Sequence, residues 1–182
     1  MQIFHEGSLE LRFPDEARVL RWDTDVAYQR GLQRRADTKA VDFCLLTPTG
    51  EPVLLELSDL RGYRIENKAH LASGGMALEV AQKVRDSLSG MIWACERGLS
   101  EFDRFERLVH RFANRAQKLR VVLWLEEDRS ADPGSADALG SAIRGRLRSW
   151  LNAQVIVTSR ELEQQTNHPL DWLEVRGSPL AP

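Results

Sequence analysis

Two acidic residues, Asp42 and Glu56, stand in otherwise apolar runs that a short turn separates. The residues between the runs read Thr-Pro-Thr-Gly-Glu over positions 47–51. Pro48 suits the first central position of a type I turn, and Gly50 suits the left-handed position that follows it. The pattern therefore predicts a β-hairpin with a glycine bulge in its loop, and it puts one carboxylate on each strand.

The same turn predicts the register of the hairpin. Counting back from the loop pairs Cys44 with Leu54 and Asp42 with Glu56. The two acids then point to the same side of the sheet, with Cβ atoms roughly 4.5–5.5 Å apart. Ser58 follows Glu56 on that side, because side chains alternate along a strand. We therefore take Asp42, Glu56 and Ser58 as the candidate site.

Two like charges that face each other in apolar surroundings are unfavourable, so their repulsion must be neutralised. One acid can take up a proton, an arginine such as Arg61 or Arg64 can enter, or a divalent cation can bind. Two carboxylates and a backbone carbonyl supply the hard oxygen ligands that Mg²⁺ prefers. An ion pair with arginine and a metal site are equally compatible with this pattern.

The hairpin resembles that of the PD-(D/E)XK nuclease superfamily, which has the restriction-endonuclease-like fold. That pattern has an Asp at the start of one strand and Glu-x-Lys on the next, with a helix before the Asp and a long helix and a strand after the Lys. The chain shows this order from about Thr24 to Leu125. The resemblance implies that Asp42 and Glu56 bind Mg²⁺ or Mn²⁺, with the Leu57 carbonyl as a further ligand and Asp25 as the acid of the preceding helix.

Ser58 departs from this pattern, because it stands where the family has its lysine. The resemblance implies that the lysine orients the attacking water and offsets phosphate charge, whereas a hydroxyl supplies no charge. Some members of such families move the lysine elsewhere. The basic residues that could replace it here are Lys39, Arg61, Arg64, Lys68 and Lys83, and each is otherwise interpreted as a solvated surface charge.

The elements around the hairpin follow from hydrophobic periodicity and from caps and breakers. We predict strands over 9–13, 18–22, 121–125 and 155–158, and helices from 24 or 25 to about 35, from 73 to about 97, over 101–118 and from 135 or 137 to 151, with an irregular tail after 166. The long helix has one core-facing stripe, made of Ala77, Val80, Ala81, Val84, Leu88, Met91, Ile92 and Cys95. The fold class is α/β, with a mixed central sheet flanked by helices.

Composition limits the class of protein. The chain has 182 residues, 25 Lys+Arg against 27 Asp+Glu, and a net charge of -2. We expect one domain over 1–182, with its core at about 24–160, and no need for a disulfide or structural metal. No apolar run approaches the ~18 residues of a membrane span, and the first residues are not a signal peptide. We expect a cytoplasmic protein with no membrane partner.

Charge and cysteine use exclude little more. The overall charge excludes a strongly basic nucleic-acid binder but not a local groove. Arg144, Arg146 and Arg148 are interpreted as an ordinary charged helix face or as a phosphate-contacting patch. Cys44 and Cys95 are interpreted as buried thiols, since neither lies in a metal-binding pattern.

Three functions compete at this point. The first is a Mg²⁺-dependent nuclease that acts on phosphodiesters of DNA or RNA, with Asp42 and Glu56 as metal ligands. The second is a catalytically degenerate nuclease-fold domain that binds nucleic acid or a protein partner, which Ser58 favours. The third is a structural acidic pair on an unrelated α/β domain. The sequence does not indicate DNA or RNA preference, sequence specificity, pathway or oligomeric state.

Overall fold

The computed structural model describes residues 1–33, 37–62, 71, 73–96, 119–128, 132–165 and 170–177. The charged helix predicted over 101–118 lies outside these residues, as do Arg64 and Lys68. No helix in the described ranges has both the length and the apolar character needed to cross a bilayer.

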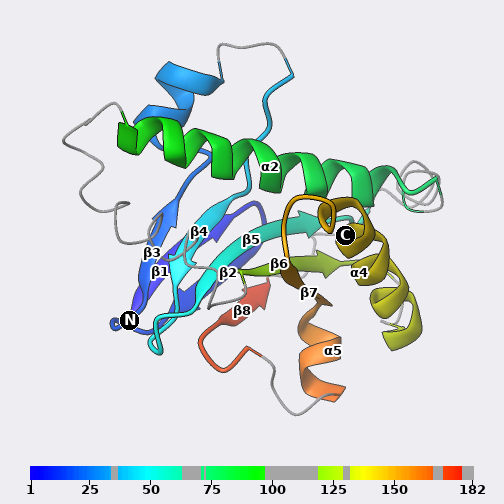
Figure 1. Ribbon diagram of the computed structural model, residues 1–182. Coiled ribbons are helices and arrows are strands. Elements are labelled where there is room, and N and C mark those ends of the chain that lie inside the picture. Colours follow the sequence, from blue (N-terminus) through cyan, green and yellow to red (C-terminus); the bar gives the residue numbers. More distant parts are fainter. Residues whose placement is uncertain are drawn as a thin grey trace.

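The described strands form two sheets (Figure 1). The larger sheet contains, from edge to edge, β3 (Arg18–Arg21), β4 (Phe43–Leu46), β5 (Pro52–Asp59), β6 (Leu119–Glu126) and β7 (Ala153–Thr158). The smaller sheet contains β1 (Gln2–Glu6), β2 (Leu9–Phe13) and β8 (Glu174–Gly177), in that order. The helical elements are the π-helical turn η1 (Tyr28–Leu32) and the α-helices α2 (Gly75–Glu96), α4 (Pro133–Leu147) and α5 (Arg160–Gln165). The α/β class and the mixed sheet are therefore confirmed.

The type of strand pairing changes once across the larger sheet. β4 runs antiparallel to both of its neighbours, β3 and β5, whereas β5, β6 and β7 are parallel. Parallel neighbours need a crossover connection, and α2 and α4 lie in the two connections concerned. The predicted strands 9–13, 18–22, 121–125 and 155–158 are all present, with small shifts of their ends.

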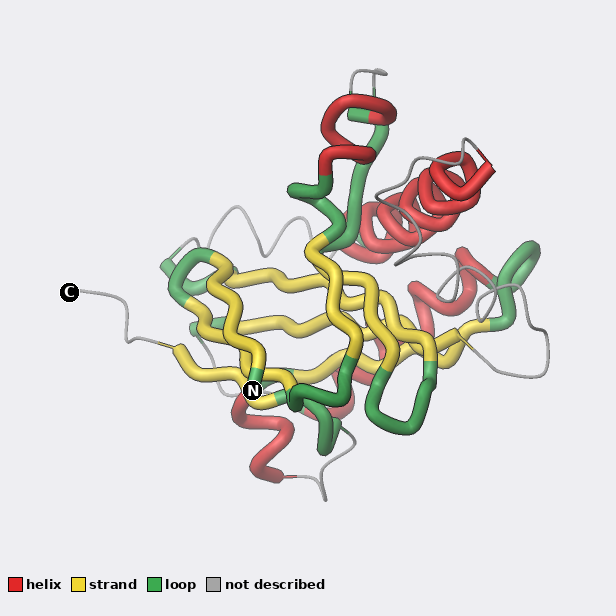
Figure 2. Tube along the Cα trace, turned by 90° about the vertical axis from the view of Figure 1, so that its left-hand side faces the viewer, coloured by secondary structure: helices red, strands yellow, loops and turns green. Residues whose placement is uncertain are grey.

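The two faces of the larger sheet are covered differently. Cys44 and Leu54 pack with α2 and α4 on one face, whereas Phe43 and Leu55 pack with the smaller sheet on the other. Figure 2 shows α2 on one side of the strands. Helices therefore cover one face of the larger sheet, as predicted, and in the described part of the chain a second sheet, which was not predicted, packs on the other face. Its strand β8 lies in the tail that we expected to be irregular.

Helix α4 begins earlier than predicted because Asp132 caps it. The Asp132 carboxylate accepts hydrogen bonds from the backbone N–H groups of Gly134 and Ser135, at 3.2 and 3.0 Å. Pro133 occupies the first turn, where a missing N–H costs nothing. The Asp-Pro-Gly segment is thus a helix start and not a break, and the helix ends at Leu147 and not at Leu151.

Glycine is required where η1 meets α2. A Cβ atom added to Gly31 would lie 2.6 Å from Cζ3 of the Trp93 ring, which is closer than real Cβ contacts. We expect Gly31→Ala to lower the free energy of unfolding by about 1–3 kcal/mol, the usual range for overpacking. Urea unfolding measures this change.

Gly145 of α4 provides the matched control, because a Cβ added there meets nothing within 4 Å. Gly145→Ala should stabilise the protein by roughly 0.5–1 kcal/mol, since alanine is the better helix former. Equal effects of the two substitutions would contradict the contact between η1 and Trp93.

Candidate active site

The predicted hairpin register is confirmed. Cys44 pairs with Leu54, and the next pair toward the site is Phe43 with Leu55. Gly50 has a φ of 82°, the left-handed value that its position in the turn requires. Because β4 begins at Phe43, Asp42 stands one residue before the strand, and the register continues from it toward Glu56 of β5.

The backbone around Asp42 is held from three directions. The Asp42 carbonyl accepts a hydrogen bond from the Trp22 N–H at 2.8 Å. The Asp42 carboxylate accepts one from the Leu57 N–H at 2.7 Å. The preceding residue, Val41, donates its N–H to the Ser87 hydroxyl of α2 at 3.0 Å. Asp42 is therefore fixed beside the strand that carries Glu56, and its side chain is buried.

Glu56 has one charged partner and one free oxygen. Its side chain is 7% exposed, and its Oε1 atom accepts a hydrogen bond from Lys83 Nζ of α2. Its Oε2 atom is buried and has no hydrogen-bond donor among the residues that the structure describes. Lys83 was expected to be a solvated surface charge, and that interpretation is wrong, since its side chain is only 20% exposed.

Burial sets the protonation of the site. Burial raises the pKa of Asp42 to about 6, although the Leu57 hydrogen bond and Lys83 oppose it. Burial and then the nearby Asp42 charge raise the pKa of Glu56 well above its usual range. Burial lowers the pKa of Lys83, but the charges of Glu56 and Asp42 outweigh it and raise that pKa. The site therefore holds a lysine cation against two carboxyl groups that resist ionisation.

Lowering the pH from 8 to 5 is expected to stabilise the metal-free protein. The folded pKa of Asp42 is about 6, and its unfolded pKa is about 3.9, so the folded chain binds protons that the unfolded chain does not. Stability is therefore lost as the pH rises through 6. Asp42 alone accounts for about 1.4 kcal/mol between pH 8 and pH 5. Urea unfolding in EDTA at the two pH values measures it.

Asp42→Asn isolates this contribution, because asparagine keeps an oxygen for the Leu57 N–H. The difference in pH dependence between wild type and Asp42→Asn should equal the contribution of Asp42. Identical pH dependence in the two proteins would mean that Asp42 titrates normally.

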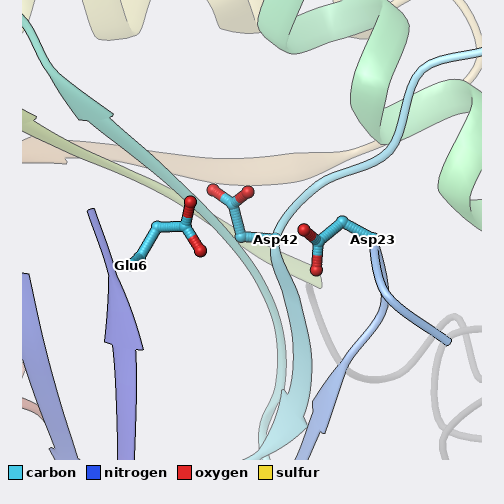
Figure 3. Close-up of side chains that lie close together, drawn as sticks. All are labelled: Glu6, Asp23 and Asp42. Atoms are coloured by element: carbon cyan, nitrogen blue, oxygen red, sulfur yellow. The ribbon is translucent and has the colours of Figure 1, made fainter.

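Two further carboxylates approach Asp42 (Figure 3). Glu6 comes from the end of β1 and Asp23 follows β3, and one oxygen from each of the three acids lies within 4.8 Å of the other two. Arg21 pairs with Glu6 and lies 3.3 Å from Asp23, so this outer part of the cluster is partly neutralised. The three acids could hold a metal ion. Asp25 is not part of this group, and its carboxylate accepts from the Ala27 N–H instead.

The other predicted residues lie apart from the acid pair. The Arg61 guanidinium binds Asp59 at 2.7 Å and the Ser8 hydroxyl at 2.6 Å. This ion pair lowers the pKa of Asp59 to about 2. Ser58 is half-buried on β5 and pairs with Leu125 of β6 in the strand register. The cation beside Glu56 is thus Lys83 of the following helix, and Ser58 does not supply a charge.

A cavity lies apart from the acid pair. It has a volume of about 590 Å³ and lies where β6 and β7 end against α4. Asp42, Glu56 and Lys83 do not line it. Among the described residues that line it there is no lysine or arginine. Four of them are acidic, namely Glu126, Glu127, Asp132 and Glu161. Its apolar, acidic walls do not suit a phosphate chain, and we assign the chemistry to the acid pair.

Comparison of the chain with protein-family models, with curated proteins and with solved structures finds no match. A function must therefore be argued from the site and from the hairpin that carries it.

Proposed function

We propose that the chain is a Mg²⁺-dependent nuclease of the restriction-endonuclease-like fold, which cleaves phosphodiesters of DNA or RNA. The observation that carries the proposal is the contact between Lys83 Nζ and Glu56, beside the buried Asp42. It provides the lysine charge that Ser58 lacks. The site thus combines two carboxylates with a lysine, the residue types of the PD-(D/E)XK pattern.

The order of elements supports the same proposal. Asp42 stands directly before β4, and Glu56 lies on the antiparallel neighbour β5. The long helix α2 and the strand β6 follow, and β6 is parallel to β5. A short helical turn, η1, precedes Asp42 along the chain. This is the order that the resemblance implies around the two acids.

The donor set fits a hard divalent cation. Glu56 Oε2 is a buried oxygen with no donor in the described chain, and Asp42 carries a second buried carboxylate. Glu6 and Asp23 add oxygens on the outer side. Mg²⁺ and Mn²⁺ prefer oxygen ligands of this kind. When bound, such an ion polarises a phosphate oxygen and lowers the pKa of a coordinated water.

The residues of the chain have separate tasks in this proposal. The Leu57 N–H holds the Asp42 carboxylate, and Lys83 holds the Glu56 carboxylate, so that the hydrogen bond fixes the orientation of each. The Lys83 ammonium lies where negative charge develops on the phosphate, and a fixed cation there stabilises the transition state. The buried setting strengthens that interaction because little water screens it.

Cleavage assays test the proposal. Supercoiled plasmid and circular single-stranded DNA are incubated with Mg²⁺ or Mn²⁺, and the expected result is cleavage of at least one substrate by the wild type. Glu56→Gln and Lys83→Met should each lower the rate by about 10²–10³-fold, the usual loss when one charge-stabilising group is removed. Lys39→Met, which removes a more exposed lysine paired with Glu79, should leave the rate unchanged.

Two results of these assays would contradict the proposal. No cleavage of either substrate by the wild type would overturn the proposed activity and favour the degenerate, binding-only domain. Equal cleavage by wild type and Glu56→Gln would assign the activity to a contaminant.

Mn²⁺ is expected to raise the melting temperature of the wild-type protein at pH 8. A cation that binds only the folded chain adds about 1.4 kcal/mol when its concentration is about ten times its Kd. For a protein of this size that corresponds to about 3–6 °C. Asp42→Asn should abolish the increment, and thermal denaturation with and without EDTA measures it.

Glu51→Gln serves as the control, because Glu51 lies in the hairpin turn and is 47% exposed. That variant should keep the whole Mn²⁺ increment. Loss of the increment in both variants, or its absence in the wild type at millimolar Mn²⁺, would end the ion-site argument and leave only the fold.

A further inference from the structure

The carboxyl end of α4 carries a group of exposed arginines. Arg144, Arg146 and Arg148 are all exposed, and none of them makes an ion pair with any residue in the described ranges. Most other described basic side chains are paired, as Arg21, Arg61 and Lys83 are. Three free positive charges thus lie within five successive positions.

The surrounding sequence carries no opposite charge. Between Asp137 and Glu161 the chain has no acidic residue, although it contains 27 acids in all. Arg160 lies in the same stretch, but it bonds to the buried Glu126 and is used inside the fold. The positive charge at the end of α4 is therefore local, in a protein whose net charge is -2.

An aromatic ring lies next to these charges. Trp150 is 47% exposed, whereas Trp22, Trp124 and Trp172 are buried. The backbone N–H of Trp150 donates a hydrogen bond to the Leu147 carbonyl at 3.1 Å, so Trp150 lies in the turn that closes the helix. The ring is thus held on the outside, in a place where it can stack.

The core side of α4 fixes this arrangement. Ile143 and Leu147 are fully buried, so the residues between and after them must face outward. Arg144 and Arg148 lie one turn apart on one flank of the helix, whereas Arg146 lies on the other flank. The guanidinium of Arg146 reaches Gly74, next to the start of α2. We call Arg144, Arg148 and Trp150 the α4-end surface.

We propose that the α4-end surface binds a single-stranded nucleic acid, with the arginines on phosphates and Trp150 stacked on a base. Basic side chains that neutralise phosphates, together with an aromatic side chain on which a base stacks, are the features by which proteins bind single strands. The inference rests on the proposed function, in which such a strand is the substrate. The acid cluster at Asp42 repels a polyanion, so affinity must come from another surface.

The helix dipole offers a competing explanation, since arginines near a helix carboxyl end stabilise the helix without any ligand. Anisotropy of a fluorescent oligodeoxythymidylate separates the two explanations. The measurement is made in EDTA, so that no strand is cleaved. We expect the double variant Arg144→Gln/Arg148→Gln to bind about tenfold more weakly than wild type. The slope of log K against log salt should become less steep by about 1.4, because each phosphate contact on a single strand contributes about 0.7 to its magnitude.

A matched double variant controls for charge. Arg18 and Arg30 are also exposed, and neither makes an ion pair among the described residues. Arg18→Gln/Arg30→Gln removes the same charge from other elements and should leave both the affinity and the salt slope unchanged. Equal weakening by the two double variants would show general attraction and overturn the proposed surface.

Trp150 tests the stacking. Trp150→Ala should weaken the oligonucleotide about tenfold, and Trp150→Phe, which keeps a ring, should recover most of the loss. Neither variant should change the affinity for heparin, a polyanion without bases. If Trp150→Ala leaves oligonucleotide binding unchanged, the single-strand proposal is overturned.

Failure of the surface and failure of the nuclease proposal give different results. Loss of binding in Arg144→Gln/Arg148→Gln without any wild-type cleavage supports the surface and removes the activity. Wild-type cleavage together with full binding by that double variant overturns the surface and keeps the activity. A lower melting temperature with unchanged binding assigns the arginines to the helix dipole.

Discussion

Val84→Asp is expected to leave the protein unfolded, whereas Ile92→Asp on the same helix should leave it folded. Val84 is fully buried in the core between α2 and the larger sheet, and Ile92 is 53% exposed. An unpaired carboxylate in a core costs several kcal/mol, which is comparable to the whole stability of a small protein. Circular dichroism and urea unfolding of the two purified variants measure the contrast.

Val84→Ala separates the effect of charge from the effect of lost volume. It should remain folded and lose roughly 1–3 kcal/mol, as expected when buried methyl groups are removed. A Val84→Asp protein that melts normally would contradict the packing of α2 on the sheet. An unfolded Ile92→Asp protein would show that the stripe predicted from sequence was right and that the exposure of Ile92 is wrong.

The pair Ser87 and Ile92 shows what apolar periodicity can and cannot predict. The spacing gave the correct direction for the core face of α2, since Val80, Val84 and Met91 are buried. It assigned one edge of that face wrongly, because Ile92 is exposed while the polar Ser87 is fully buried. Ser87 is buried because its hydroxyl accepts the Val41 N–H from a neighbouring segment. That hydrogen bond joins residues far apart in sequence, and no period along one helix contains it.

The second sheet could not be predicted for a related reason. β8 has four residues with only one buried side chain, and its stability comes from pairing with β2. Such a short segment has too few positions to show alternation. Its pairing partner lies at the opposite end of the chain, so local sequence carries no signal for the contact.

The candidate site shows the same difference between local structure, which can be predicted, and long-range contacts, which cannot. Turn chemistry at Pro48 and Gly50 was enough to predict the register that brings Asp42 toward Glu56, because a hairpin is a local structure. Lys83 was among the candidates for the missing lysine, but its place on the flank of α2 argued for solvent exposure. Glu6 gave no signal, since its approach to Asp42 depends on how the smaller sheet lies against the larger one. Asp23 gave none either, because its approach depends on the pairing of β3 with β4.

Lys83→Met is expected to destabilise the metal-free protein by about 3 kcal/mol at pH 8 and by much less at pH 5. Removing one partner of a buried ion pair leaves an uncompensated charge, here on Glu56, whose side chain is 7% exposed. A lower pH favours the protonated form of Glu56, because burial and then the Asp42 charge raise its pKa well above its usual range, and the missing cation then matters less. Urea unfolding at both pH values measures the difference.

The double variant Lys83→Met/Glu56→Gln completes the cycle. A neutral pair of similar size should recover most of the stability lost by Lys83→Met at pH 8, because burying two neutral groups avoids the desolvation of charge. A coupling energy near zero would mean that Lys83 and Glu56 do not interact in solution. Lys39→Met, whose ion pair with Glu79 is more exposed, should cost no more than about 1 kcal/mol at either pH.

The same double variant separates the structural task of the pair from its proposed catalytic task. If Lys83 and Glu56 serve only to hold α2 on β5, a double variant that regains stability should regain whatever activity the single variant lost. If they act on the phosphodiester, the stable double variant should remain inactive with Mg²⁺ or Mn²⁺, since it has neither the carboxylate nor the cation. Wild-type cleavage rates in a folded Lys83→Met/Glu56→Gln protein would therefore rule out this site as the catalytic centre.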